Sequence, residues 1–261
     1  MRADIYLFSS GNAKSRQNAK ILIESGNVII DGKKITKPAL EIDELIEHRV
    51  EIINKSRFVS RGGEKLDFAL EKFNVNVQDA ICIDIGASTG GFTDCLLQKG
   101  AKLVCAVDSG HSQLDPAIEN DKRVISIEKF NAKFMKKDDF PLTFDIAVMD
   151  VSFISQTLIH SSINEVLKDD GVLISLVKPQ FECGKNALNS HGIVKKASHH
   201  KDAIFKVIDS ALLCGFSCMD IIRSPIEGGS GNVEFLIYLK KSSHPKNYID
   251  ENKVKLISHT K

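Results

Sequence analysis

Apolar and polar positions follow two different patterns along this chain, and the change falls near residue 80. From there on, several short runs are apolar enough to form buried strands: 81–85, 103–107, 124–127, 145–149, 172–177, 217–222 and 234–239. Segments with helical spacing separate most of these runs, notably 90–99, 154–168 and 200–214. Continuous apolar strands that alternate with helices predict a mainly parallel sheet covered on both faces.

The last two predicted strands are joined by a short connection that contains Pro225 and the pair Gly228-Gly229. A parallel crossover needs a longer connection, so we expect these strands to form an antiparallel hairpin at the sheet edge. The predicted fold class is therefore α/β, with a seven-stranded, mainly parallel sheet and one reversed strand. This is the architecture of the class I, Rossmann-like methyltransferase fold.

The first 55 residues follow the other pattern. Residues 15–26 begin with an N-cap serine and end with a C-cap glycine, which predicts a helix. Residues 27–35 predict a hairpin with Asp31-Gly32 as its turn. Seven Lys and Arg but three acidic residues lie between positions 2 and 37, and five acidic residues follow between 41 and 51. The pattern fits either a small α+β module with a basic face or a solvated surface with accidental charge.

Composition narrows the class of protein. Of the 261 residues, 43% are hydrophobic and 26% are charged, which excludes a disordered or fibrous chain. The net charge is +1, so any attraction to nucleic acid or membrane must be local. No apolar run approaches the ~20 residues of a membrane-spanning helix. The N-terminal Met1-Arg2-Ala3-Asp4-Ile5 has an acid where a secretion signal needs an apolar core, so we expect a cytoplasmic protein.

The six cysteines fit that compartment. Most lie in apolar runs, where a free thiol behaves as a small hydrophobic group. Cys214 and Cys218 are close in sequence but have no second Cys or His pair at ligand spacing, so we expect no bound metal.

A glycine-rich turn follows the first strand of the predicted sheet, in residues 84–93. Such a turn brings backbone N–H groups and a helix N-terminus close to a ligand. It lacks the Gly-Lys-Ser/Thr ending of a P-loop, and Ser88 replaces the middle glycine of a dinucleotide-binding turn. Asp84 suits an ammonium or sulfonium group, and Asp108 at the end of the next strand suits ribose hydroxyls. S-adenosylmethionine offers all of these groups; the alternative is a structural turn with a buried carboxylate.

Four polar residues stand beside apolar segments: Lys65, Asp150, Lys178 and Glu234. Asp150 and Lys178 end the fourth and fifth predicted strands, where open α/β sheets place their sites, and Glu234 begins the seventh. Each alone could be an exposed strand end or, for Lys65, a solvated helix face. Together they offer two lysines and two carboxylates that could direct a lysine toward a hydroxyl.

The sequence also bears on which atom would accept a methyl group. Asp150-Val151-Ser152-Phe153 lacks the two prolines of the turn that methylates exocyclic amines. Carbon methylation of pyrimidines needs a nucleophilic cysteine, for which Cys183 is the candidate beside the crevice. An oxygen acceptor remains the best fit.

In these motifs the sequence resembles the TlyA family of haemolysin-like ribosomal RNA ribose methyltransferases, over about residues 1–240. The N-terminal module resembles the S4-type RNA-binding domain, and the rest resembles the FtsJ-type ribose 2′-O-methyltransferase domain. The matching segments are 15–17, 59–66, 84–93, 150–155, 177–182 and 231–234. Gly228-Gly229-Ser230 departs from the family, whose members often carry proline or a basic residue there, so no basic RNA contact is expected in this loop.

The resemblance implies an S4-type domain at 1–55, a linker at 56–64, an FtsJ-like domain at 65–241 and a frayed polar tail at 242–261. It implies a catalytic tetrad of Lys65, Asp150, Lys178 and Glu234. In this tetrad we expect Lys178 to accept the proton, both carboxylates to orient it, and Lys65 to orient the ribose or the developing oxyanion; the alternative is that Lys65 is the proton acceptor. The implied cofactor is S-adenosylmethionine, at Asp84, Gly86, Ala87, Ser88, Thr89, Gly90, Gly91, Phe92, Thr93 and Asp108, with Glu128 and Asn131 near the adenine.

The expected partner is ribosomal RNA or a ribosomal subunit. We expect the protein itself to be a monomer. RNA contacts are expected at Arg2, Lys14, Ser15, Arg16, Lys20, Lys33, Arg57 and Arg61. Two alternative functions belong to other classes of protein. One is a membrane-active haemolysin, which the family name suggests but the apolar pattern does not support. The other is an RNA-binding protein without catalysis, against which the four intact tetrad positions stand.

Overall fold

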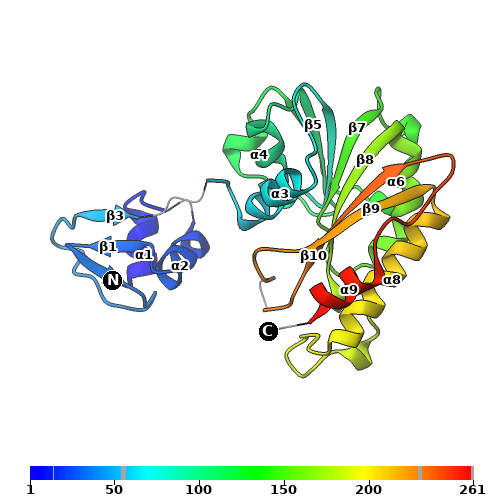
Figure 1. The fold of residues 1–261 in the computed structure, drawn as a ribbon. Coiled ribbons are helices and arrows are strands. Elements are labelled where there is room, and N and C mark those ends of the chain that lie inside the picture. Colours follow the sequence, from blue (N-terminus) through cyan, green and yellow to red (C-terminus); the bar gives the residue numbers. More distant parts are fainter. Residues whose placement is uncertain (14, 54–56, 229–230, 260–261) are drawn as a thin grey trace. The chain divides into compact units, whose positions relative to one another are not determined.

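The computed structural model describes residues 1–261 except 14, 54–56, 229–230 and 260–261. The described residues form two compact units, an N-terminal unit of Met1–Arg57 and a second unit of Phe58–Lys261 (Figure 1). Each unit has hydrophobic core residues of its own.

The N-terminal unit combines two helices with a three-stranded sheet. Its elements are α1 (Ala3–Ser9), α2 (Arg16–Glu24), β1 (Val28–Ile30), β2 (Lys33–Ile35) and β3 (Val50–Ile52), with the strands in the order β2-β1-β3. The predicted helix and hairpin are confirmed. Ser15 Oγ accepts the Asn18 N–H at 3.1 Å as the N-cap of α2, and β1 pairs antiparallel with β2. The sequence pattern does not predict α1 or β3, because both are short.

The second unit is built on the predicted sheet of seven strands. They are β4 (Ile81–Ile85), β5 (Leu103–Val107), β6 (Val124–Ile127), β7 (Phe144–Met149), β8 (Leu167–Val177), β9 (Phe216–Arg223) and β10 (Phe235–Lys241). The sheet order is β6-β5-β4-β7-β8-β10-β9. Strands β4 to β8 run parallel, and β10 lies antiparallel between β8 and β9. The predicted hairpin is thus present, and its reversed strand is one place in from the edge.

Helices cover both faces of this sheet (Figure 1). One face packs against α3 (Arg61–Lys72), α4 (Gly91–Gln98) and α5 (Pro116–Glu119), and the other against α6 (His160–Val166), α8 (Ala197–Leu213) and α9 (Glu251–Ser258). The short helices are α7 (Pro179–Glu182), η1 (Ala132–Phe134), η2 (Lys137–Asp139), η3 (Gln156–Leu158) and η4 (Lys185–Ala187). Successive strand side chains point to opposite faces, so burial on both faces explains the continuous apolar runs.

Three boundaries differ from those expected. The helix predicted at 154–168 is divided into η3 and α6, and it stops early because β8 begins at Leu167. Helix α3 begins at Arg61, inside the expected linker. The tail expected to be frayed contains α9, in which Val254 and Ile257 form an apolar face against the core. The polar composition of the tail hides this narrow face.

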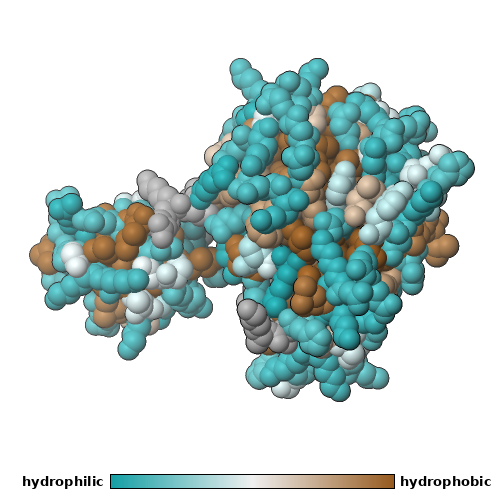
Figure 2. Space-filling view, viewed as in Figure 1, coloured by the Kyte–Doolittle hydropathy of each residue, from teal (hydrophilic) through white to brown (hydrophobic). Residues whose placement is uncertain are grey.

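The carboxyl ends of β4, β5, β7 and β8 lie along one edge of the sheet. The glycine-rich turn, Asp108, Asp150 and Lys178 directly follow these four strand ends. Hydrophilic side chains cover most of the face of the second unit that Figure 2 shows. In the part of the chain that the structure describes, no helix is both long and apolar enough to cross a membrane.

Candidate active site

The turn between β4 and α4 packs closely against two neighbouring segments. Gly86 has a φ of +83°, and a Cβ there would lie 2.6 Å from the Asp150 carbonyl oxygen, so neither the conformation nor the space accepts a side chain. At Gly91 a Cβ would lie 2.0 Å from Ser60 Oγ. These glycines let the turn approach the loop after β7 and the start of α3, the helix that carries Lys65.

A cleft of about 560 Å³ opens beside this turn, within the usual range for small-molecule sites. Its polar lining includes Ser88, Asp108 and Asn131, and its apolar lining includes Phe130, Val151 and Ile154. The Asp108 carboxylate accepts the backbone N–H groups of Ser88 at 2.8 Å and of Gly110 at 2.7 Å. Each carboxylate oxygen has a further lone pair that can accept a hydroxyl group of a ligand.

The other residues expected around the cofactor lie in several places. Asn131 lines the cleft, whereas Glu128, half-buried after β6, is not part of its lining. Gly90 is not part of this lining either, and a Cβ there would lie 3.0 Å from the Leu114 side chain and 3.1 Å from that of Ile118. The remaining turn residues line a second, adjoining cavity: Ala87, Thr89, Gly91 and Phe92.

Asp84 lies in β4 beneath the turn, is completely buried and does not line the cleft. Its Oδ2 accepts the Thr93 hydroxyl at 2.7 Å, and its Oδ1 has no hydrogen-bond partner among the described residues. Burial raises the pKa of this carboxyl to about 7. The next two residues, Ile85 and Gly86, line the cleft, so the ionised form of Asp84 would favour a cationic ligand there through charge and not through a direct contact.

The four residues of the predicted tetrad form two ion pairs. Lys178 Nζ lies 2.6 Å from Asp150 Oδ1 and donates to Ser152 Oγ at 2.8 Å. Lys65 Nζ donates to Glu234 Oε2 at 2.5 Å, and the exposed fractions of these two side chains are 9% and 3%. We expected both carboxylates to orient Lys178, but Glu234 holds Lys65. The reason is the fold: Glu234 lies two residues before Leu236, which packs on the same face of the sheet as α3.

The second cavity, of about 290 Å³, lies between the ion pairs and the turn. Lys65, Asp150 and Lys178 line it together with Arg61, a predicted RNA contact. Gly86, Ser88, Asp150 and Ser152 line both cavities, so the two adjoin. A ligand in the larger cleft can therefore meet a group held in the smaller one. Within the described residues, no three His, Cys, Asp or Glu side chains gather as metal ligands.

Sequence reasoning missed Ser152, Phe153 and Phe181 as site residues. Phe153 is 92% exposed and has a φ of +64°, which is unusual for a bulky residue. Its ring lies 5.3 Å from the ring of Phe181, and Lys178 Nζ lies 5.9 Å from the centre of the Phe181 ring. An aromatic residue soon after Asp150 is visible in the sequence, but its exposure and backbone conformation follow from the fold.

The basic residues expected on the N-terminal unit are organised around a buried acid. Arg2 Nε donates to Asp4 Oδ1 at 2.9 Å, and Arg16 Nε donates to Asp4 Oδ2 at 3.1 Å. These guanidinium groups, Arg2 first, lower the pKa of Asp4 to about 2. Both arginines are thus fixed in direction at the start of α1 and α2.

The other predicted RNA contacts are spread over this unit. Lys20 pairs with Glu24 along α2 at 3.8 Å, and Ser15 is engaged as the N-cap. Lys33 in β2 and Arg57 at the end of the unit are exposed. Lys14 lies outside the described residues.

The sheet order, the glycine-rich turn after β4 and the cleft at the carboxyl edge define the class I methyltransferase fold. A solved structure from Listeria monocytogenes, described as an S-adenosylmethionine-dependent methyltransferase, shares the fold with a TM-score of 0.54 and 16% identity, over 70% of this chain and 100% of that chain. The model of the FtsJ-like methyltransferase family matches residues 58–241, and that of the S4 domain matches residues 1–44. The chain therefore belongs to the FtsJ-like methyltransferase family and carries an S4 domain.

Relatives over nearly the whole chain confirm the resemblance to the TlyA family. Hemolysin A of Brachyspira hyodysenteriae is 41% identical over 242 residues, which cover 91% of this chain and 99% of that protein. The 16S/23S rRNA (cytidine-2′-O)-methyltransferase TlyA of Mycobacterium tuberculosis is 37% identical over 239 residues, which cover 92% of this chain and 89% of that protein.

A solved structure of a hemolysin-named protein from Streptococcus thermophilus has a TM-score of 0.80 and 41% identity, and the match covers 99% of this chain and 94% of that chain. The fold and the family together imply S-adenosylmethionine as the cofactor.

Proposed function

We propose that this protein transfers a methyl group from S-adenosylmethionine to the 2′-hydroxyl of a ribose in ribosomal RNA. The observation that carries the proposal is the set of two lysine–carboxylate pairs, Lys178–Asp150 and Lys65–Glu234, beside a cleft of cofactor size. Transfer to a hydroxyl requires a group that takes up the proton and groups that hold the ribose in line. The name of the mycobacterial relative supports ribosomal RNA as the substrate and the 2′-oxygen as the acceptor.

The residues of the larger cleft fit S-adenosylmethionine. Asp108 would accept the ribose hydroxyls of the cofactor, and Phe130 and Asn131 would contact its adenine. Asp84, buried beneath the turn, would offset the positive charge of the cofactor when its carboxyl group is ionised. When bound, the cofactor supplies a methyl group on a sulfonium, which is electrophilic without further activation. The protein's own task is then to place and deprotonate the acceptor.

Lys178 is the residue that we assign to the acceptor proton. Two partners, Asp150 and Ser152, fix its Nζ, and the side chain lines the smaller cavity. A lysine accepts a proton only in its neutral form, so the rate should rise with pH wherever proton removal limits turnover. Lys65, held by Glu234 in a nearly buried pair, would donate to the ribose and orient it.

RNA affinity in this proposal comes from the S4 domain and from the mouth of the smaller cavity. Asp4 fixes Arg2 and Arg16 in direction, and their remaining N–H groups would bind backbone phosphates. Arg61 places a positive charge at the catalytic cavity. The exposed ring of Phe153 offers a surface on which a nucleobase would stack next to Lys178.

The test is a map of ribose methylation in the ribosomal RNA of cells that carry the wild-type gene, a Lys178→Ala gene or no gene. The wild type should add 2′-O-methyl groups that the other two strains lack. Identical maps in all three strains would overturn the proposal. A methyl group that persists with Lys178→Ala would leave the methyltransferase standing and remove Lys178 from its mechanism.

A further inference from the structure

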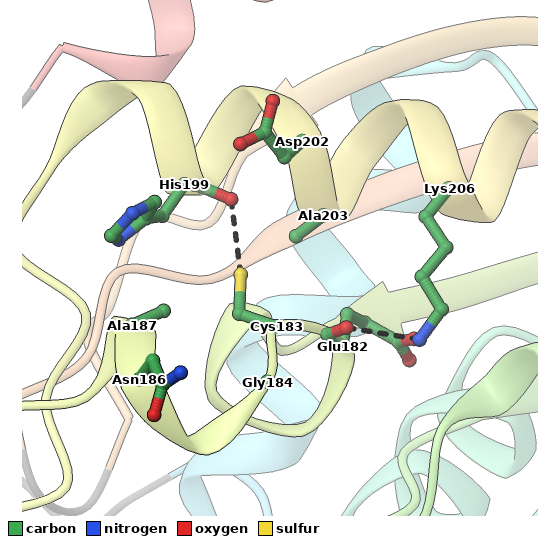
Figure 3. A pocket seen from close by; sticks show the side chains of 9 residues that line it. All are labelled: Glu182, Cys183, Gly184, Asn186, Ala187, His199, Asp202, Ala203 and Lys206. Carbon is green, nitrogen blue, oxygen red and sulfur yellow. Dashed lines mark hydrogen bonds and ion pairs between the residues drawn. The ribbon is translucent and has the colours of Figure 1, made fainter.

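Glu182 is a buried carboxylate that the chemistry above does not use. It is the last residue of α7, and its side chain is only 2% exposed. The Ser155 hydroxyl donates to its Oε2 at 2.5 Å, and the Gln156 N–H donates to its Oε1 at 2.9 Å. Lys206 Nζ lies 3.3 Å from Oε2. Figure 3 shows Lys206 reaching from α8 toward Glu182 at the wall of a pocket.

These contacts join the two segments that carry the Lys178–Asp150 pair. Residues 150–156 follow β7 and contain Asp150, and residues 178–182 follow β8 and contain Lys178. Glu182 belongs to the second segment and accepts both of its hydrogen bonds from the end of the first. The carboxylate therefore connects the loops of the two catalytic residues through Ser155 and Gln156.

The same network extends from the first loop into the sheet. Gln156 is almost completely buried, its Oε1 accepts the Ser175 hydroxyl at 2.6 Å, and its Nε2 donates to the Leu176 carbonyl at 3.4 Å. Ser175 and Leu176 are the β8 residues shortly before Lys178. Gln156, in the loop after β7, is thus hydrogen-bonded to the chain on both sides of Lys178: to Ser175 and Leu176 before it and to Glu182 after it.

A carboxylate is a costly way to join two loops, because burial of its charge must be offset by partners. Lys206 provides an opposite charge and also donates to the Glu182 carbonyl at 2.9 Å. Apolar packing could hold the loops together without this cost. The carboxylate adds direction, because each of its oxygens engages a donor on the opposite loop and any sliding of the loops breaks a charge-assisted bond.

We propose that Glu182 is a positioning residue that fixes the loop of Asp150 against the loop of Lys178 and so holds these two side chains in their 2.6 Å contact. The proposal rests on the proposed function, since it gives that pair a catalytic purpose. Misplacement of reacting groups by 1 Å costs about 100-fold in rate. Loss of Glu182 should therefore slow methyl transfer while the affinities for cofactor and RNA stay close to those of the wild type.

Two substitutions at Glu182 separate positioning from simple burial. Glu182→Gln keeps the size and an acceptor for the Gln156 N–H, whereas Glu182→Ala removes both acceptors. Glu251→Ala is the matched control, because Glu251 also pairs with a lysine of α8, Lys201 at 2.6 Å, but is 69% exposed. Single-turnover methylation of ribosomal RNA, cofactor binding by calorimetry and Tm are measured on each full-length variant.

At an assay temperature well below the Tm of each variant, we expect the single-turnover rate to fall about 100-fold in Glu182→Ala. The rate should recover in large part in Glu182→Gln. Glu251→Ala should match the wild type. The rate–pH profile of Glu182→Ala should also differ from that of the wild type, because Lys178 would no longer lie in its 2.6 Å contact with the Asp150 carboxylate. If Glu182→Ala does not fold, Ser155→Ala replaces it and should cost about 10-fold, the worth of one buried hydrogen bond.

A wild-type rate and pH profile in the folded alanine variant, with only a lower Tm, would show a purely structural residue and overturn the proposal. A loss of cofactor affinity as large as the loss of rate would also overturn it. An inactive wild type would instead refute the proposed function. The two failures are therefore distinguishable in one set of measurements.

Discussion

Replacing Asp84 by asparagine should change how the stability of the protein depends on pH. Asp84 is completely buried in β4, and burial raises its pKa from 3.8 to about 7. Between these values the folded chain holds the proton more tightly than the unfolded chain does. The stability that the protonated carboxyl contributes is therefore fully present below pH 3.8 and is lost as the pH rises through about 7.

The size of the effect follows from the two pKa values. Through this one group, the wild type should lose roughly 2–3 kcal/mol of unfolding free energy between pH 5 and pH 8. Asparagine has the same shape and still accepts the Thr93 hydroxyl, but it does not ionise. Its amide N–H groups would lack an acceptor at the place of Oδ1, at a cost of about 1–3 kcal/mol that is the same at every pH. The variant should thus gain on the wild type by roughly 2–3 kcal/mol from pH 5 to pH 8.

Urea unfolding followed by far-UV circular dichroism measures this difference, since the chain has no tryptophan for fluorescence. The transition of the second unit is compared at each pH. His160, whose burial lowers its pKa to about 4, titrates in an overlapping range, but it is present in both proteins and cancels in the difference. A difference that stays constant within about 0.5 kcal/mol over this range would refute a buried, protonated Asp84.

Four further predictions concern the site. Gly86→Arg should abolish cofactor binding in a calorimetric titration, because even a Cβ there would lie 2.6 Å from a backbone carbonyl oxygen, and undiminished affinity would contradict the turn as the cofactor site. Lys178→Ala should slow single-turnover methylation about 10²–10⁴-fold with cofactor affinity within a few-fold, and Glu234→Gln should cost less; a wild-type rate in the lysine variant would remove it from the mechanism. Phe153→Ala should lower the methylation rate at limiting RNA about 10-fold, and Phe153→Tyr should restore it, because a nucleobase would stack on the ring. Equal rates in all three proteins would show that no base stacks there. Lys33→Ala should lower the slope of log affinity for RNA against log salt by about one, whereas an unchanged slope would exclude a phosphate contact.

The sheet could be predicted from the sequence because its strands are covered on both faces. The runs at 81–85 and 103–107 coincide with β4 and β5, since each is a short segment of mostly apolar residues, with Asp84 as the one polar member of the first. Helix α9 could not be predicted in the same way. Its apolar face is narrow and becomes visible only where α8 and β9 pack against it.

The members of the candidate site were easier to predict than their contacts. Asp150 and Lys178 directly follow parallel strands, so their positions place them at the carboxyl edge of the sheet. The partner of Glu234 depends on the sheet order and on the face of β10, neither of which the sequence pattern specifies. Glu182 is harder still, because its three partners come from segments that only the fold brings together.

The central claim is that the methyl group is transferred to a ribose oxygen and that the Lys178–Asp150 pair takes up the proton of this hydroxyl. The most direct measurement incubates ribosomal RNA with the purified protein and methyl-labelled S-adenosylmethionine, and then locates the label by mass spectrometry of the released nucleosides. We predict label in the ribose fragment of the modified nucleoside with the wild type and a loss of nearly all label with Lys178→Ala. Label in the base fragment, or equal labelling by both proteins, would contradict the claim.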